Sequence, residues 1–137
     1  MAEPITVETR VKAPVAKVWE YWNDPEHITG WAFASEDWEA PDAENDLRVG
    51  GQFRIAMAAK DKSAGFDWIG TYSALEENRL IGYVMGDGRH VQITFEETPE
   101  GTQVTETFDP ENLHPPEFQR AGWQAILENF RKYVESR

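Results

Sequence analysis

The stretch EFQRAGWQAILENFRKYVESR, from Glu117 to Arg137, decides the fold of this chain. Its large apolar side chains recur at spacings of three and four residues, so they share one side of a helix. They are Trp123, Ile126, Leu127, Phe130 and Val134. Pro115 and Pro116 come just before the stretch, where a helix tolerates proline in its first turn. We therefore predict a C-terminal helix of about twenty residues, roughly 30 Å long.

Upstream of this helix, the chain consists mostly of short apolar segments or segments that alternate between apolar and polar residues. Both patterns are typical of strands with at least one buried face. The predicted strands cover residues 5–13, 51–59, 65–75, 79–85, 90–97 and 103–109. Turn signals separate several of them, at Lys60–Ser63, Gly86–Gly88 and Thr98–Gly101. The acidic segment from Phe33 to Val49 shows neither pattern, and we predict that it is irregular.

The spacing changes after the first predicted strand. Val15, Val18, Trp19 and Trp22 recur at three and four residues, which predicts a short amphipathic helix that begins after Pro14. The stretch Asn23-Asp24-Pro25 ends it and opens a second short helix that closes near Gly30. The predicted order is a strand, two short helices, five or six antiparallel strands and the long helix.

One sheet with an apolar inner face needs a cover, and the C-terminal helix is the only predicted element long enough to provide it. We therefore predict an α+β fold in which a curved antiparallel sheet wraps around that helix and leaves a hydrophobic cavity. The predicted cavity walls are apolar residues of the sheet and the helix. They are Phe53, Ile55, Trp68, Tyr72, Phe95, Trp123, Leu127 and Phe130. In the alternative, these large side chains fill the space completely.

Glu106 is the one charged residue that the alternation places on the inner face, between Val104 and Phe108 and opposite Ile93. An unpaired carboxylate at this position is costly, so its pKa is expected to be raised. Glu106 is therefore a predicted polar anchor for a ligand or a general acid or base. In the alternative, it lies near the sheet margin, where it pairs with a nearby arginine or lysine or is reached by water.

Composition narrows the possible functions. The 137 residues fit a single domain, 1–137, and a net charge of −12 repels nucleic acids and anionic membranes. Cysteine is absent, and His27, His90 and His114 lie in separate elements, so no metal site or cofactor is predicted. There is no Gly-x-Ser-x-Gly context for a serine nucleophile. No signal peptide or membrane span is recognisable, and we expect a cytoplasmic protein.

Five segments resemble a known superfamily: VKAPVAKVWEYWNDPEHITGW (11–31), ENDLRVGGQFRI (44–55), FDWIGTY (66–72), ITFEETPEGTQVTETFD (93–109) and FQRAGWQAILENFRKYVE (118–135). They are similar to the START-like (SRPBCC, birch-pollen-allergen-like) superfamily, and within it to homologues of the activator of heat-shock protein 90 ATPase. The resemblance implies a helix-grip fold. It also implies that Trp19, Trp22 and Trp31 lie at the mouth of the grip, with Trp22 and Trp31 lining the cavity. Superfamily relatives bind lipids, sterols, polyketides or hormones, and a minority are enzymes.

These observations predict binding of a small hydrophobic or amphipathic ligand in an internal cavity, without catalysis. One alternative is partner binding to a heat-shock protein 90 homologue through an acidic face. The chain is expected to lack the additional N-terminal domain of the two-domain eukaryotic activator. A second alternative is a cyclase- or hydrolase-type enzyme that uses Glu106 or His90.

Overall fold

The computed structural model of the chain describes residues 3–137. Within that range there are three helices and seven strands. The helices are α1 (Val15–Asn23), α2 (Pro25–Ile28) and α3 (Pro116–Glu135). The strands are β1 (Ile5–Val11), β2 (Trp38–Asn45), β3 (Gln52–Ala59), β4 (Gly65–Glu76), β5 (Leu80–Met85), β6 (His90–Thr98) and β7 (Gly101–Phe108). The strands form one sheet in the order β1-β7-β6-β5-β4-β3-β2, and each neighbouring pair is antiparallel.

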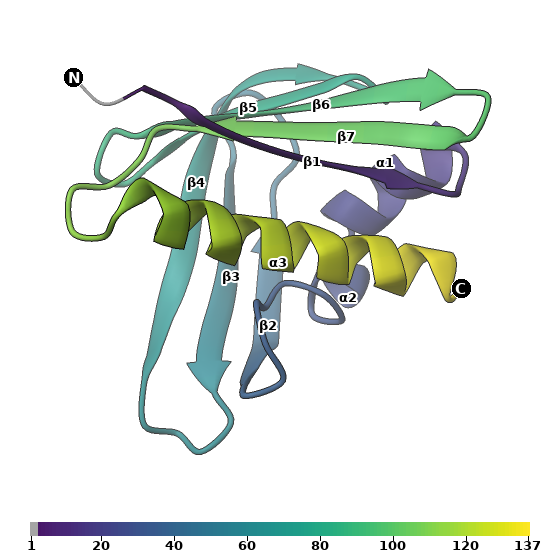
Figure 1. Cartoon of the computed structure of the whole chain (residues 1–137). Coiled ribbons are helices and arrows are strands. Elements are labelled where there is room, and N and C mark those ends of the chain that lie inside the picture. The colour runs from purple at the N-terminus through teal and green to yellow at the C-terminus, as the bar shows by residue number, and fades with distance from the viewer. Residues whose placement is uncertain (1–2) are drawn as a thin grey trace.

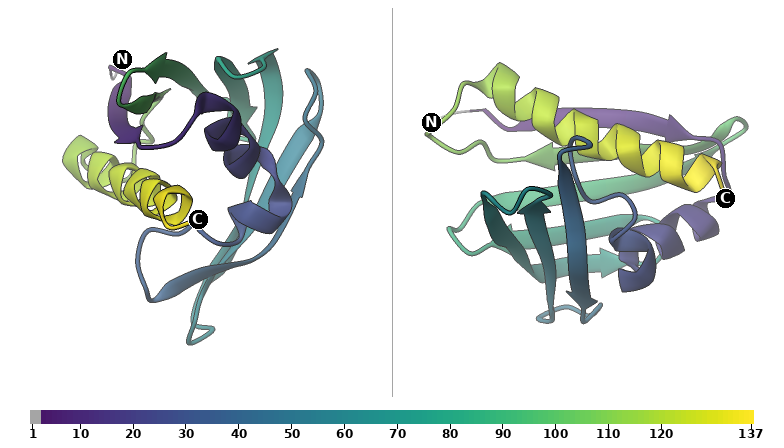
Figure 2. Two further views of the ribbon diagram at one scale, coloured as in Figure 1. Left: turned by 90° about the vertical axis from the view of Figure 1, so that its right-hand side faces the viewer. Right: turned by 90° about the horizontal axis from the view of Figure 1, so that it is seen from below.

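The sheet bends strongly, so that α3 lies across its concave side (Figure 1). The left view of Figure 2 shows the sheet curving around α3, with α1 and α2 beside the helix. Leu127, Phe130 and Val134 of the predicted apolar stripe are at most 1% exposed. The predicted helix-grip architecture, with two short helices after the first strand, is confirmed.

The segment from Phe33 to Val49 was predicted to be irregular, and this prediction is wrong. Residues Trp38–Asn45 form the edge strand β2, which pairs with β3. The register shifts between Glu39 and Asp42, on either side of Pro41, because proline cannot donate a backbone hydrogen bond to a strand ladder. β2 carries little alternation of its own. Arg54 of β3 holds it by ion pairs to Asp42 and Glu44.

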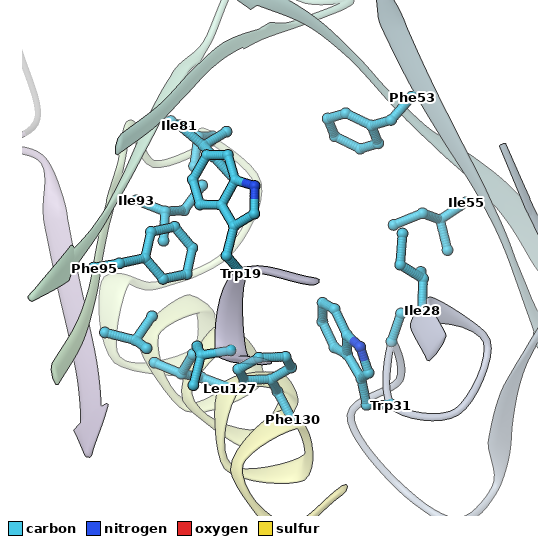
Figure 3. Packing of buried hydrophobic residues seen from close by; sticks show 14 of the residues in the cluster. Trp19, Ile28, Trp31, Phe53, Ile55, Ile81, Ile93, Phe95, Leu127 and Phe130 are labelled. Carbon is cyan, nitrogen blue, oxygen red and sulfur yellow. The ribbon is translucent and has the colours of Figure 1, made fainter. Parts of the chain in front are cut away.

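Aromatic side chains dominate the core between the short helices and α3. Phe130 is fully buried, and its ring centroid lies 4.9 Å from that of Trp22 and 4.8 Å from that of Trp31. Trp19 and Trp22 both contact Phe95 edge-on. Figure 3 shows Phe130 and Trp31 close together below the sheet, with Trp19 beside Phe95. Edge-to-face contacts of this kind add to the stabilisation by burial.

Gly70 lets two rings pack over β4. A methyl group at this position would lie 2.6 Å from the Tyr83 ring and 2.7 Å from Phe53 Cζ, and both rings are buried. We expect Gly70→Ala to lower the free energy of unfolding by about 1–3 kcal/mol, because the rings must leave their packed positions. Urea denaturation measures this change. Gly86→Ala is the matched control, since a methyl group there meets no atom of the described residues within 4 Å. Equal stability of the two variants would contradict the prediction.

Candidate functional site

A pocket lies between α3 and the concave face of the sheet, and we call it the internal pocket. Its volume is about 60 Å³. Aromatic and aliphatic side chains form most of its wall, and a few polar groups face it. It is lined by Trp22, Asn23, Ile28, Trp31, Ala32, Asn45, Phe53, Ile55, Met57, Trp68, Tyr72, Ile81, Tyr83, Glu106, Trp123 and Ile126.

Most of the predicted wall residues lie around this pocket. Those that line it are Trp22, Trp31, Phe53, Ile55, Trp68, Tyr72, Glu106 and Trp123. Phe95, Leu127 and Phe130 are buried beyond the pocket lining, in the packed core. Phe95 and Phe130 contact tryptophan rings there, which fill the space that a ligand would need. Whether the lining residues bind a ligand stays a prediction.

The sequence analysis missed three polar lining residues: Tyr83, Asn45 and Asn23. Tyr83 belongs to the apolar run RLIGYVM, in which no alternation shows the inward face. Its two-residue spacing from Ile81, which also lines the pocket, was the available signal. Asn45 ends β2, the strand that was not predicted. The apolar lining residues that were missed are Ile28, Ala32, Met57, Ile81 and Ile126.

Glu106 is buried within β7, the strand next to the edge strand β1. It pairs with Val7 of β1 on one side and with Ile93 of β6 on the other, as the alternation of β7 predicts. The side chain is 7% exposed, and within residues 3–137 it forms no salt bridge or hydrogen bond. Burial away from water raises the pKa of Glu106 from its usual 4.5 to about 8. At neutral pH, Glu106 is therefore mostly an uncharged acid that faces the pocket.

A second polar group of the pocket is also unsatisfied. Trp68 Nε1 is fully buried and has no hydrogen-bond partner among the described residues. It approaches the Tyr83 hydroxyl, but the geometry falls short of a hydrogen bond. Burial and the nearby Glu106 raise the pKa of Tyr83 well above its usual value. Trp68 N–H and Glu106 are thus two unpaired polar groups around one small space.

The Tyr72 hydroxyl, by contrast, is held in place. It donates a hydrogen bond of 2.6 Å to Asn45 Oδ1, and Asn45 Nδ2 donates one of 2.7 Å to the Asn23 carbonyl. Burial raises the pKa of Tyr72, so its hydroxyl stays protonated at neutral pH. This chain of hydrogen bonds ties β4 and β2 to the end of α1 and gives one side of the pocket a fixed polar wall.

An open groove, which we call the outer groove, runs over the surface between α3 and the ends of β4 and β5. Its volume is about 570 Å³. Trp68, Trp123 and Ile126 line both the groove and the internal pocket, so they form the wall between the two spaces. Apolar side chains stand exposed around the groove. They are Phe66, Ile69 and Phe118.

The wall between the two spaces consists largely of stacked rings. Trp123 lies flat on Phe108 at 3.8 Å between centroids, and it meets Trp68 edge-on at 4.9 Å. Gly122, beside Trp123, also lines the outer groove. A methyl group at Gly122 would meet no atom of the described residues within 4 Å. Gly122 therefore does not serve close packing of α3 against a strand, and it leaves the groove open.

The described part of the chain offers little support for a metal site, for catalysis by His90 or for a membrane-spanning helix. Within residues 3–137, no three His, Asp or Glu side chains are grouped so that they could hold a metal ion. His90 is exposed at the start of β6 and does not line the internal pocket, so it is not placed beside Glu106. No helix of the described range is both long enough and apolar enough to cross a membrane.

Comparisons with known proteins agree with this architecture. The model of the family "Activator of Hsp90 ATPase homolog 1-like protein" matches residues 12–135. The solution structure of an AHSA1-like protein from Aeromonas hydrophila is 47% identical, with a TM-score of 0.92 over 98% of this chain and 93% of that one. A protein from Cytophaga hutchinsonii is 51% identical, with a TM-score of 0.83 over 96% and 92% of the two chains. The search of functionally curated proteins found no match.

Proposed function

The chain belongs to the family of Activator of Hsp90 ATPase homolog 1-like proteins, and from this premise we propose that it binds a small amphipathic molecule in the internal pocket, without catalysis. One observation carries the proposal. Two polar groups of the pocket lining, the Glu106 carboxyl on a side chain that is 7% exposed and the fully buried Trp68 Nε1–H, form no hydrogen bond within residues 3–137. Buried polar groups are almost always hydrogen-bonded, and each unpaired one costs about 1–3 kcal/mol. A ligand that pairs with both groups removes this cost.

The size of the internal pocket sets the size of what enters it. Its volume of about 60 Å³ is far below the roughly 300–1,000 Å³ of pockets that enclose drug-sized ligands. The pocket therefore suits a compact polar head rather than a whole sterol. The outer groove, at about 570 Å³, suits the apolar remainder of such a molecule. Burial of that remainder against Phe66, Ile69 and Phe118 would supply affinity at about 25 cal/mol per Å².

The wall between the two spaces must move for a molecule to occupy both. Trp68 and Trp123 are only partly buried, and their rings contact each other edge-on. Rotation of partly exposed aromatic side chains disturbs fewer packed neighbours than movement of a core ring such as Phe130. We place the entrance at these two tryptophans.

The test begins with native mass spectrometry of the purified protein, which detects a co-purifying molecule. Titrations with an aliphatic alcohol, an amine, a fatty acid and a sterol follow, monitored by tryptophan fluorescence and calorimetry. We expect saturable binding of at least one probe. Trp68→Phe should raise its Kd about threefold to tenfold, because the N–H donor is lost while the ring remains. Trp38→Phe, outside the pocket lining, removes one indole as well and should leave the Kd unchanged.

Absence of a bound molecule together with no saturable response to any probe would overturn the proposal. The aromatic side chains around the pocket would then serve only as part of the hydrophobic core. Equal effects of Trp68→Phe and Trp38→Phe would also contradict it, because binding would lie elsewhere on the protein.

A second candidate function is partner binding to an Hsp90 homologue. It is favoured by the family of this chain and by its net charge of −12, which would attract a basic surface. Its signature would be a complex that weakens with salt and changes the ATPase rate of the partner. An unchanged ATPase rate at low salt would count against it.

A further inference from the structure

We infer that the internal pocket selects a small organic cation, with a primary ammonium group paired to Glu106. This inference rests on the proposed function and names the chemical class of the ligand. The pocket combines one carboxyl group with seven aromatic rings. Both attract ammonium groups, the carboxylate by its charge and the rings by the negative potential of their faces.

No cationic side chain of the described residues is paired with Glu106, so the cation of a ligand can take that position. Several arginines within residues 3–137 form salt bridges with other carboxylates, and no arginine or lysine of this range forms one with Glu106. The other ionisable groups that line the pocket are the phenols of Tyr72 on β4 and Tyr83 on β5. Its partners across the strands are the apolar Val7 and Ile93, and α3 contributes Trp123 and Ile126. Arg89, whose charge acts on Tyr83, is paired with Asp87.

The same residues determine which kind of ligand head group fits the pocket. A volume of about 60 Å³ admits a primary ammonium more readily than a bulky quaternary one. An anionic head would lose its hydration in a low-dielectric space, and wherever Glu106 is ionised it would also place a second negative charge beside that carboxylate. Trp68 Nε1–H offers a hydrogen bond to an oxygen next to the ammonium group, so an amino alcohol would use both unpaired groups.

Binding of a cation must release a proton, since Glu106 is protonated in the empty pocket below pH 8. Affinity should therefore rise about tenfold per pH unit from pH 6 and level off above pH 8. Tyr72 and Tyr83 stay neutral over this range, because burial raises the pKa of both phenols. A neutral ligand has no such dependence on pH.

The test compares probes with the same chain and different heads: hexylamine, hexyltrimethylammonium, hexanol and hexanoate. Binding is measured by calorimetry at about 0.15 M salt, because salt at this concentration screens the general attraction of an acidic protein for cations. At pH 8, hexylamine should bind at least tenfold more tightly than hexanol, and hexanoate should not bind. Glu106→Gln should weaken hexylamine at least about tenfold and hexanol by no more than about threefold, because the glutamine amide still offers a hydrogen bond to a hydroxyl but no charge to an ammonium group. Glu96→Gln removes one exposed carboxylate of β6, so it is the charge-matched control and should change neither.

The outcomes separate the two proposals. Binding of hexanol with no preference for hexylamine, or hexylamine binding that survives Glu106→Gln, would overturn the cation inference and leave the binding function standing. A lack of binding by all four probes would count against both. Tighter binding of the quaternary head than of the primary one would show that the pocket widens and would overturn the choice of a primary ammonium.

Discussion

Replacement of Phe130 by alanine is expected to lower the free energy of unfolding by about 3–5 kcal/mol. The ring is fully buried and contacts Trp22 and Trp31 edge-on at the junction of α3 with the two short helices. Alanine leaves a cavity that these rigid indoles cannot close without disturbing Phe95. Urea denaturation monitored by circular dichroism measures the change.

Phe118→Ala is the control on the same helix. Phe118 is 64% exposed, so its truncation should change the free energy of unfolding by no more than about 0.5 kcal/mol. Similar losses in the two variants would mean that α3 is not held by the aromatic contacts at Phe130. A loss below about 1 kcal/mol for Phe130→Ala would mean that the core collapses around the missing ring.

Glu106→Gln is expected to stabilise the protein increasingly as pH rises from 5 to 8. The folded state raises the pKa of Glu106 from 4.5 to about 8, so between these values the folded protein holds a proton that the unfolded chain has lost. The contribution of Glu106 to stability is therefore fully present below pH 4.5 and falls by about 1.4 kcal/mol per pH unit. It is lost above pH 8, after a total change of about 4–5 kcal/mol.

Glutamine has nearly the shape of the protonated acid and does not titrate. The variant and the parent should therefore have similar stability near pH 5, and the variant should be more stable by several kcal/mol at pH 8. Urea denaturation of both proteins at four pH values gives the difference between their free energies of unfolding. The contributions of the other carboxylates are the same in both proteins and cancel in this difference. A difference that does not change with pH would show that Glu106 has an ordinary pKa and is reached by water.

The sequence predicted the features of the fold that follow from local periodicity. The spacing of apolar residues in Glu117–Arg137 identified α3 and its buried stripe, and the change of spacing after Pro14 identified α1. The stretch Asn23-Asp24-Pro25 identified the start of α2. The alternation of β7 placed Glu106 inward and opposite Ile93. Periodicity succeeds here because the regular geometry of a helix or strand decides which side chains share a face.

Other features depended on the partners of each segment. Trp38–Asn45 forms a strand because it pairs with the edge of β3 and because Arg54 of β3 forms ion pairs with Asp42 and Glu44. The residue pattern of the segment itself shows neither contact. Every residue around Tyr83 in the sequence is apolar, so the pattern does not show which face of β5 carries its side chain. That face is decided by the elements that pack against the strand, and it turns toward the internal pocket.

The sequence by itself determined that aromatic side chains gather between a curved sheet and one helix, with a single carboxyl group among them. Only the tertiary structure decided which of these side chains close the core and which leave a space. Phe95 and Phe130 meet tryptophan rings and fill their share of the interior, whereas Trp68 and Glu106 face a pocket of about 60 Å³. The reason is that periodicity specifies the direction of a side chain. The bend of the sheet and the positions of the short helices set the distance to what lies opposite.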